Sequence, residues 1–514
     1  MKVEIIKALD LKTRTDLLVL PVCEDRVMQG GPVLQLDKLL DGTLKQLVEE
    51  EDFKGKPGQG LTFHTMGKAG ALRVALLGLG PEEKVAAERF RRLAGRAAEV
   101  ARKYRVKSLT LACPVPAAPG LEVKQAVGAM AEGLSLGLYR FDKYKKEPEG
   151  RPPYTGPQKV SVIGFGADGR PYTDSGALKA AVERAEALAG GVKIARDLVN
   201  EIPEVMTPEE LAKKAGELAS ATPGLKLRVL DSKAMARWKM NAALAVARGS
   251  DRKPCFIELG YAPRGAGRGP GLFLVGKGVT FDSGGLNIKP GEHMATMKMD
   301  MAGAAAVIAA ITVVARMKLP VRVTALVAAV ENLPGGRAYK PDDVVAALDG
   351  TTIEVGNTDA EGRVTLADSL GWAVKHKAGR IVDLATLTGS CVVGLGPHTA
   401  GALGNDEPWL DQVCRAAGEA GEKVALLPLD EDMEDDIKSE VADVKNVGAT
   451  RFGGAITGAL FLQKFVKDTP WVHLDIAGPA WADKKRDYAP VGGTGFGVRL
   501  LVHLVERLAQ ERQA

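Results

Sequence analysis

The sequence predicts an α/β protein built from two α/β domains, a smaller N-terminal one and a larger C-terminal one. The chain has 514 residues, which exceeds the ~100–200 residues of a typical domain. Short apolar runs that end near glycine or proline alternate with helix-like stretches along the chain, and this alternation is typical of α/β folds. The composition, 46% hydrophobic and 26% charged, is ordinary for a protein with a packed core.

The N-terminal domain is expected over residues 1–170. A helical pattern covers Glu82–Tyr104, and a stretch rich in proline, glycine and lysine at 143–156 is expected to be a surface loop. Strand-like apolar runs lie at residues 15–22, 73–80, 106–115 and 159–166. We therefore expect a sheet with helices between its strands.

The C-terminal domain is expected over residues 199–514, after a linking helix within 171–198. The longest uncharged apolar run, Met301–Ala315, is shorter than the ~20 residues that cross a bilayer, so it is expected to be a buried helix. Strand-like runs lie at residues 271–276, 321–330, 380–387 and 471–478. The alternation of the first half thus continues in the second.

The termini and cysteines favour a cytoplasmic location. The first 16 residues carry charges throughout and contain no apolar signal-peptide core. The five cysteines form no CxxC pair, so reduced thiols are expected. Cys391 is interpreted as a buried structural thiol. The six histidines form no HExxH motif, which excludes the common zinc-protease pattern.

Residues 357–363, Asn-Thr-Asp-Ala-Glu-Gly-Arg, carry Asp359, Glu361 and Arg363 two positions apart. In an extended segment these side chains would share one face. Such a cluster is costly unless it is occupied: divalent cations would satisfy the carboxylates and an anion the arginine. Thr365 and Asp368 form a capping-box pattern, which predicts that a helix begins after Arg363.

A second charged set precedes this one, with Lys277, Asp282, Lys289 and Asp300. The apolar run at 271–276 is predicted to be a buried strand, so Lys277 would follow a strand's carboxyl end, where α/β folds bind ligands. Four carboxylates in all favour two metal ions, an arrangement suited to activating water for hydrolysis. Taken singly, the same pairs could be surface ion pairs, and spacing leaves both interpretations open.

Several motifs together resemble the leucyl aminopeptidases, peptidase family M17. They are VGKGVTFDSGGLNIKP, MKMDMAGAAAV, NTDAEGRV, DLATLTGSCVVGLG and HLDIAGPAW, in this order within residues 190–500. The resemblance implies a macro-like N-terminal domain and a catalytic C-terminal domain whose mixed central sheet is flanked by helices. It also implies a metal-dependent aminopeptidase that releases apolar N-terminal residues, preferentially leucine, from peptides.

The resemblance implies a role for each charged residue of the two clusters. Asp282 and Glu361 would bridge two divalent ions, Mn²⁺ or Zn²⁺. The complete set of implied metal ligands is Lys277, Asp282, Asp300, Asp359 and Glu361. Lys277 could ligate only as the neutral amine, and both burial and an adjacent cation lower a lysine pKa.

Two further residues are implied to be catalytic. Lys289 would remain charged and stabilise the oxyanion of the reacting carbonyl. Arg363 would hold a bicarbonate ion through two parallel hydrogen bonds, and this ion would carry the proton.

A pocket for the first side chain of the peptide is also implied. Met297 and Leu387 suit an apolar side chain, although both would also suit an ordinary core. The implied lining residues are Met297, Asn357, Ala360, Thr386, Leu387, Gly389 and Ala477. Family members are homohexamers, so a homohexamer that acts on peptides, without a membrane partner, is expected.

Charge leaves DNA binding as an alternative function of the N-terminal domain. Residues 1–170 contain 28 basic and 21 acidic side chains, a net charge of +7, and eight of the basic residues lie between Arg89 and Lys107. Such a domain could bind phosphates, but few aromatics and no helix-turn-helix pattern accompany it, and a solvated helix face explains the same residues.

Three other interpretations remain. The segment GFGADG at 164–169 matches GxGxxG, but turn-like residues follow it, which argues against a dinucleotide site. An inactive scaffold is disfavoured because every expected site position is filled. A two-metal hydrolase acting on another amide or ester would share the same chemistry.

Overall fold

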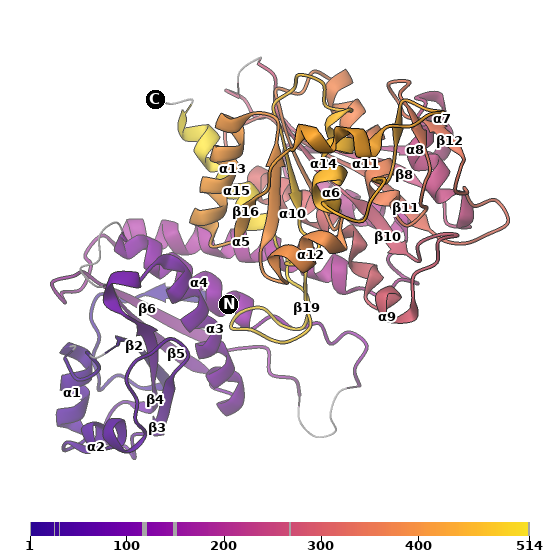
Figure 1. Cartoon of the computed structure of the whole chain (residues 1–514). Helices are drawn as coiled ribbons and strands as arrows, with labels where there is room; N and C mark the ends of the chain where they lie inside the picture. The colour runs from indigo at the N-terminus through magenta and orange to yellow at the C-terminus, as the bar shows by residue number, and fades with distance from the viewer. Residues whose placement is uncertain are drawn as a thin grey trace. The chain divides into compact units, whose positions relative to one another are not determined.

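The computed structural model describes residues 2–24, 26–29, 31–115, 121–146, 152–266 and 269–511. The chain forms two compact units, residues 1–189 with 484–490, and residues 190–483 with 491–514. Each unit is a sheet flanked by helices (Figure 1), which confirms the prediction of two α/β domains. Helix α5 (Ser175–Asn200) contains the point at which the chain passes from one unit to the other.

The N-terminal unit has a six-stranded sheet in the order β1-β6-β5-β2-β4-β3. All neighbouring strands are parallel except β3 and β4. The strands are β1 (Lys2–Ile5), β2 (Thr15–Cys23), β3 (Gly60–His64), β4 (Ala71–Gly80), β5 (Ser108–Pro114) and β6 (Lys159–Phe165). The four strands predicted from apolar runs are β2, β4, β5 and β6.

Alternate residues of these strands enter two different cores. In β2, Leu17 and Val19 pack with the helices on one face, whereas Leu18 and Leu20 pack with those on the other, as the two-residue period of a strand requires. Helices α3 (Ala87–Tyr104) and α4 (Val123–Gly137) cover the first face. Helices α1 (Gly31–Leu39) and α2 (Thr43–Glu50) cover the second.

The C-terminal unit has a nine-stranded mixed sheet in the order β16-β15-β18-β14-β9-β11-β8-β7, with β10 paired to β11. Its strands are β7 (Leu225–Asp231), β8 (Cys255–Tyr261), β9 (Leu272–Gly276), β10 (Gly278–Asp282), β11 (Val323–Asn332), β14 (Arg380–Ala385), β15 (Ala400–Gly404), β16 (Val424–Leu426) and β18 (Trp471–Asp475). The predicted mixed central sheet is therefore confirmed. Smaller pairings join β12 (Val344–Ala346), β13 (Thr352–Glu354) and β17 (Val444–Lys445), and β19 (Trp481–Ala482) with β20 (Gly492–Gly493).

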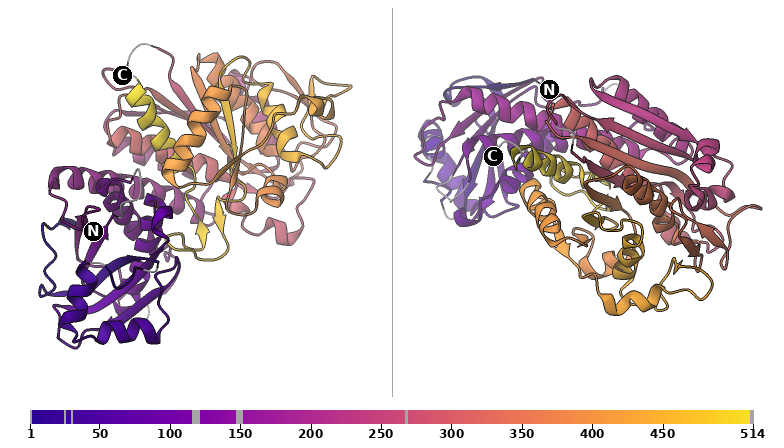
Figure 2. Two further views of the ribbon diagram at one scale, coloured as in Figure 1. Left: turned by 60° about the vertical axis from the view of Figure 1, so that its left-hand side comes forward. Right: turned by 90° about the horizontal axis from the view of Figure 1, so that it is seen from above.

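Helices lie on both faces of this sheet (Figure 2). One layer contains α8 (Asn241–Val246), α11 (Glu361–Lys375) and α14 (Gly454–Gln463). The other contains α6 (Pro208–Ser220), α10 (Ala302–Arg316), α13 (Glu407–Ala420) and α15 (Val498–Glu511). Short helices α7 (Ser232–Arg237), α9 (Gly291–Met294) and α12 (Gly389–Leu395) and the 3₁₀ turn η3 (Met297–Met301) complete the unit.

The stretch Met297–Arg316 is long and apolar enough to cross a membrane, but 83% of it is buried inside the protein. Its helix α10 contacts strands β9, β11 and β14, so it is a core helix, as predicted from the run Met301–Ala315. All five cysteines are free thiols, and Cys391 is buried as expected.

Three local predictions were wrong or incomplete. The pattern at Glu82–Tyr104 forms a 3₁₀ turn at Glu82–Lys84 and then α3, because Val85 is extended between them. Helix α11 begins at Glu361 rather than after Arg363. Thr365 therefore lies inside that helix and donates its hydroxyl to the carbonyl of Gly362. The predicted loop at 143–156 lies partly outside the described residues.

Candidate metal centre

Five parallel strands of the larger unit place polar side chains at one edge of the sheet. Strands β9, β10, β11, β14 and β18 run in the same direction, so their carboxyl ends lie together, where open α/β sheets bind ligands. Lys277 follows β9, Asp282 ends β10, Asn332 ends β11, Thr386 follows β14 and Asp475 ends β18.

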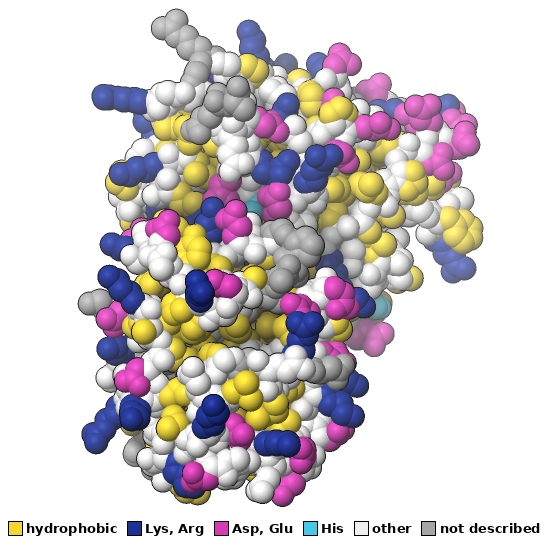
Figure 3. Space-filling model, turned by 90° about the vertical axis from the view of Figure 1, so that its left-hand side faces the viewer, with side chains coloured by type: hydrophobic (Ala, Val, Ile, Leu, Met, Phe, Trp, Pro, Cys, Tyr) yellow, Lys and Arg dark blue, Asp and Glu magenta, His cyan; other side chains and the backbone are white. Residues whose placement is uncertain are grey.

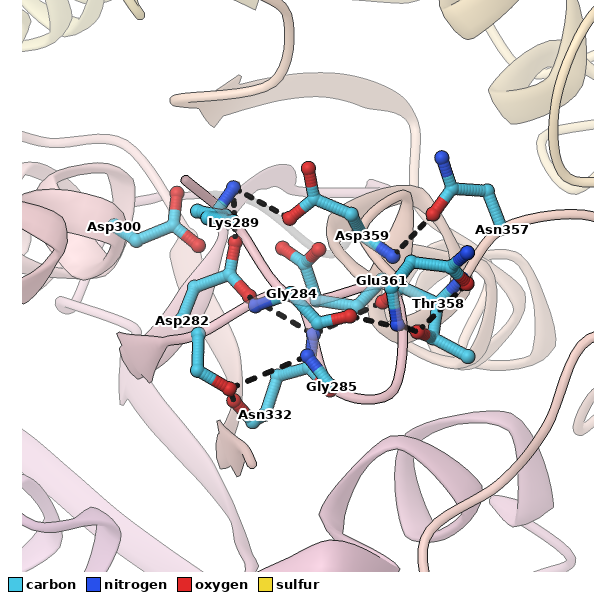
Figure 4. Close-up of polar contacts among 12 residues, drawn as sticks. Asp282, Gly284, Gly285, Lys289, Asp300, Asn332, Asn357, Thr358, Asp359 and Glu361 are labelled. Carbon is cyan, nitrogen blue, oxygen red and sulfur yellow. Dashed lines mark hydrogen bonds and ion pairs between the residues drawn. The ribbon is translucent and has the colours of Figure 1, made fainter. Parts of the chain in front are cut away.

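Three carboxylates meet at this edge. Asp282, Asp359 and Glu361 each offer an oxygen within 4.8 Å of the others, and Figure 4 shows them facing one another around Lys289. Glu361 is the first residue of α11 and Asp359 lies in the turn before it. The prediction that residues 359–363 form an extended segment was therefore wrong, although it correctly put Asp359 and Glu361 together.

Two lysines lie among the carboxylates. Lys277 Nζ is 2.7 Å from Asp300 Oδ1 and 2.8 Å from Glu361 Oε1. Lys289 Nζ is 2.8 Å from Asp282 Oδ2 and 2.6 Å from Asp359 Oδ1. Four carboxylates therefore share two ammonium groups, and the excess of negative charge fits a site for cations.

Several oxygens of this cluster lack hydrogen-bond partners. Within the described part of the chain, Asp300 Oδ2 and Glu361 Oε2 are buried without one. Because a buried carboxylate oxygen without a partner is costly, these atoms fit metal ligation. The donor set of carboxylates and one amine is compatible with divalent ions such as Mn²⁺ or Zn²⁺.

The surroundings raise the pKa values of three carboxyl groups of the cluster and of Lys277. Burial raises the pKa of Asp300 well above its usual value, despite the neighbouring Lys277. Burial also raises the pKa of Asp282 and of Asp359. Burial alone would lower the pKa of Lys277, but Asp300, Glu361 and Asp282 raise it above the ordinary value. The carboxylates thus hold a proton on Lys277.

Arg363 lies beside this cluster on α11, and only 7% of it is exposed. Its Nε has no hydrogen-bond partner among the described residues. Burial lowers the pKa of Arg363 to about 10, against the effects of Glu361 and Asp475. A buried guanidinium with an unused donor is suited to an anion.

The comparisons with known proteins identify the family. Residues 193–502 match the model of the catalytic domain of the cytosol aminopeptidase family, and residues 19–148 match the model of its N-terminal domain. This chain belongs to the cytosol aminopeptidase family. It is a metal-dependent aminopeptidase of that family, M17.

Similar proteins match over nearly the whole chain. A probable cytosol aminopeptidase of Syntrophotalea carbinolica is 44% identical, covering 97% of this chain and 98% of its own. One from Cyanothece sp. is 42% identical, with 97% and 99% covered.

Solved structures show the same fold. A mutant of tomato leucine aminopeptidase matches with a TM-score of 0.87 and 34% identity, covering 99% of this chain and 96% of its own. The bottromycin maturation enzyme BotP in complex with Mn matches with a TM-score of 0.83 and 35% identity, covering 96% and 100%.

The aminopeptidase supports its carboxylates with residues that the sequence analysis missed. Asn332 Nδ2 donates to Asp282 Oδ1 at 2.8 Å and to the Thr358 carbonyl at 2.9 Å, and Tyr339 Oη donates to the same carbonyl at 2.9 Å. The position of Asn332, a polar residue at the end of an apolar strand run, could have indicated its role from the sequence. No sequence feature indicates a role for Tyr339, because only the fold brings it to residue 358.

Glycines permit two close approaches in this centre. Gly285 has φ +63°, and a Cβ there would lie 2.7 Å from Asn332 Oδ1. A Cβ at Gly362 would lie 2.5 Å from the side chain of Lys277, so only glycine lets this lysine lie against α11.

Asp475 organises the loops that carry expected pocket residues. Its Oδ1 accepts the amides of Leu387 at 3.3 Å and Ala477 at 3.1 Å, and its Oδ2 accepts the Thr388 hydroxyl at 2.6 Å. Thr386 in turn donates its hydroxyl to Asp300 Oδ1 at 2.8 Å. The loop after β14 is thereby connected to the carboxylate cluster.

The other expected pocket residues are held on neighbouring elements. Asn357 Oδ1 accepts the amide of Asp359 at 2.8 Å. Met297 lies in η3 with Asp300, Ala360 precedes the first residue of α11, and Gly389 begins α12. Leu387 is partly buried and packs against the core of the larger unit, in agreement with the core interpretation of this residue.

The DNA-binding alternative is not supported. The arginines of α3 serve internal contacts: Arg91 pairs with Glu88 and Glu132, Arg96 Nε lies 3.3 Å from Asp487, and Arg102 donates to the Gly137 carbonyl. On the face shown in Figure 3, basic and acidic side chains are interspersed. Internal contacts thus explain part of the basic set between Arg89 and Lys107, and the family comparisons indicate peptidase chemistry instead.

Proposed function

We propose that this aminopeptidase releases apolar N-terminal residues, leucine foremost, from peptides at a centre that holds two divalent ions per subunit. The observation that carries the proposal is the cluster of Asp282, Asp359 and Glu361, whose oxygens lie within 4.8 Å of one another. The buried Lys277 and the partly buried Lys289 lie among these carboxylates, and burying so many charges is costly unless cations compensate the carboxylates.

The proposed ligands divide between the two ions. Asp282 and Glu361 would bridge both, Lys277 and Asp300 would complete one site, and Asp359 the other. The partnerless oxygens of Asp300 and Glu361 support this division. When bound, the two ions would supply Lewis-acid polarisation and an acidified water.

Lys289 and Arg363 are proposed as catalytic residues. Although burial opposes it, Asp282 and Glu361 raise the pKa of Lys289, so its ammonium stays charged and can stabilise the oxyanion that forms at the scissile carbonyl. Arg363 would hold a bicarbonate ion, and its unpartnered Nε supports this. An anion held there could accept a proton from the attacking water.

The substrate pocket is proposed to be formed by the residues that the β14 and β18 loops carry, together with those beside the carboxylates. Met297 and Leu387 would contact an apolar side chain, since apolar walls with few polar groups favour such ligands. The complete proposed lining is Met297, Asn357, Ala360, Thr386, Leu387, Gly389 and Ala477.

A homohexamer and a cytoplasmic location are also proposed. The family name and the names of the relatives support the location. The structure of BotP with Mn supports manganese as a usable ion. Light scattering after size exclusion should give six times the 54.3 kDa of the chain, and a monomer would contradict the assembly.

Hydrolysis of leucine-p-nitroanilide by chelator-treated protein tests the centre. Activity should be absent, return when Mn²⁺ or Zn²⁺ is added, and fail to return in Asp359→Ala. If the metal-loaded native chain does not hydrolyse leucine-p-nitroanilide, the proposal is wrong.

A panel of p-nitroanilides with leucine, methionine, alanine, lysine and glutamate tests the preference. One methylene changes kcat/KM by roughly 10–200-fold in an apolar pocket, so leucine should exceed alanine by at least about tenfold. Equal rates for leucine and glutamate would contradict the apolar pocket.

A further inference from the structure

A cavity of about 280 Å³ lies in the N-terminal unit. The proposed peptidase chemistry does not involve this cavity. It opens at the carboxyl ends of β2, β5 and β6. Its walls include Leu20, Val22, Val33, Val115 and Phe165, all buried and apolar.

The topology of the sheet makes this position significant. Strands β2 and β5 are parallel neighbours. Helix α1, which follows β2, packs on one face, whereas α4, which follows β5, packs on the other. Open α/β sheets bind ligands where adjacent strands send their helices to opposite faces.

The glycine-rich segment GFGADG forms one rim of the cavity. The amide of Gly166 donates to the Arg170 carbonyl and that of Gly169 to the Gly166 carbonyl, both at 2.9 Å. Asp168 accepts the Arg170 amide at 3.0 Å. Because the turn uses these groups internally, the rim is not a cradle for phosphate.

Two opposite charges line the cavity. Arg26 Nη1 pairs with Glu82 Oε2, and their side chains remain 60% and 23% exposed. A guanidinium has five N–H donors and a carboxylate two oxygens, so each group keeps bonding capacity beyond this pair. Arg89 lies nearby, with its Nη1 donating to the Leu79 carbonyl at 2.8 Å.

The thiol of Cys23 offers a chemical probe of this cavity. Cys23 lines the cavity, and burial with the effect of Glu82 raises its pKa to about 11, against Arg26 and Arg89. Both members of the charged pair, Arg26 and Glu82, therefore influence the pKa of this thiol.

We propose that the cavity binds one free apolar α-amino acid as its zwitterion. The carboxylate would pair with Arg26, the ammonium with Glu82, and the side chain would lie among the apolar walls. The volume is at the small end of ligand sites, which suits an amino acid better than a peptide. Such an amino acid would also be the product of the proposed reaction, but binding here requires no turnover.

Protection of Cys23 from alkylation tests this site in the full-length protein. L-leucine should slow labelling by N-ethylmaleimide, measured on the Cys23 peptide by mass spectrometry, by about fivefold or more at millimolar concentrations. Isocaproate, which lacks the ammonium, and isopentylamine, which lacks the carboxylate, should protect about tenfold less well. Cys414, a half-buried thiol of the other unit, should label at an unchanged rate.

Two charge variants make the test specific. Glu82→Gln should remove the advantage of leucine over isocaproate, and Arg26→Gln its advantage over isopentylamine. Both residues are partly exposed and outside the metal centre, so the variants should fold and retain the peptidase activity of the native chain.

If leucine does not protect Cys23, or if leucine, isocaproate and isopentylamine protect it equally, the proposed amino-acid site is wrong. A native chain without peptidase activity would remove the proposed function and leave the Cys23 result unaffected.

Discussion

Lys277 is a buried cation that its neighbours keep protonated. Its Nζ lies within 3.0 Å of Asp300, Glu361 and the Thr386 carbonyl, and the carboxylates raise its pKa. An ammonium cannot ligate a metal, because it has no lone pair. Ligation by Lys277 therefore requires that the incoming ion displace this proton.

This displacement predicts that metal affinity increases as the pH is raised. Since the raised pKa keeps Lys277 protonated throughout the neutral range, Mn²⁺ binding should release a proton, and the affinity should increase about tenfold for each unit by which the pH is raised, per proton released. Calorimetry in two buffers of different protonation enthalpy would count the protons. Lys277→Met should release one fewer than the native protein, and identical counts would contradict ligation by Lys277.

Arg363→Met should separate catalysis from stability. Arg363 is buried with an unused Nε, so its removal should cost about 10²–10³-fold in kcat and leave the melting temperature unchanged or higher. Arg499 is a matched buried arginine, whose Nη1 donates to the Ala420 carbonyl at 2.7 Å. Arg499 Nη2 also lies 3.7 Å from Oε1 of the buried Glu422. Arg499→Met would break this buried ion pair and should therefore lose about 3–5 kcal/mol of stability. Unchanged turnover in Arg363→Met would refute its catalytic role.

At the scale of elements, the loop after β10 shapes the centre. Thr358 Oγ1 donates to the Gly284 carbonyl at 2.6 Å, and the amide of Asn287 donates to Thr358 Oγ1 at 2.8 Å. These bonds attach the loop to the turn that carries Asp359. The loop therefore sets the separation of Asp282 from Asp359.

Gly285→Ala should damage this loop, whereas Gly291→Ala should not. A Cβ at Gly285 would lie 2.7 Å from Asn332 Oδ1, and the backbone there has φ +63°, which a residue with a side chain rarely adopts. A Cβ at Gly291 would have no atom within 4 Å. We expect Gly285→Ala to lose ~1–3 kcal/mol and bound metal, as measured by urea unfolding and elemental analysis. Equal behaviour of the two variants would show that the loop tolerates a side chain.

At the scale of the molecule, metal should stabilise one unit and not the other. The carboxylates all lie in the C-terminal unit, and a ligand at a thousand times its Kd stabilises the folded state by about 4 kcal/mol. Hydrogen exchange should therefore slow in β11 and β14 on adding Mn²⁺, with β2 and β5 unchanged. Equal slowing in both units would contradict this restriction.

The sequence by itself determined the elements and the composition of the centre. Apolar runs bounded by glycine or proline located β2, β4, β9, β11, β14 and β18, because the period of a strand is local. The charged residues of the centre were also visible in the sequence, but their spacing left a shared metal site and separate ion pairs both open. The resemblance to family M17 implied the shared set of Lys277, Asp282, Asp300, Asp359 and Glu361.

Only the tertiary structure decided which groups complete that cluster and how each charge is used. Asn332, Tyr339 and Asp475 support it from strands and loops far apart in sequence, and strand register, which local patterns do not specify, brings them together. The same holds for Arg91, Arg96 and Arg102 of α3, each of which has a partner outside this helix. It also holds for Arg26 and Glu82, which follow different strands and meet at a cavity only because β2 and β4 are neighbours.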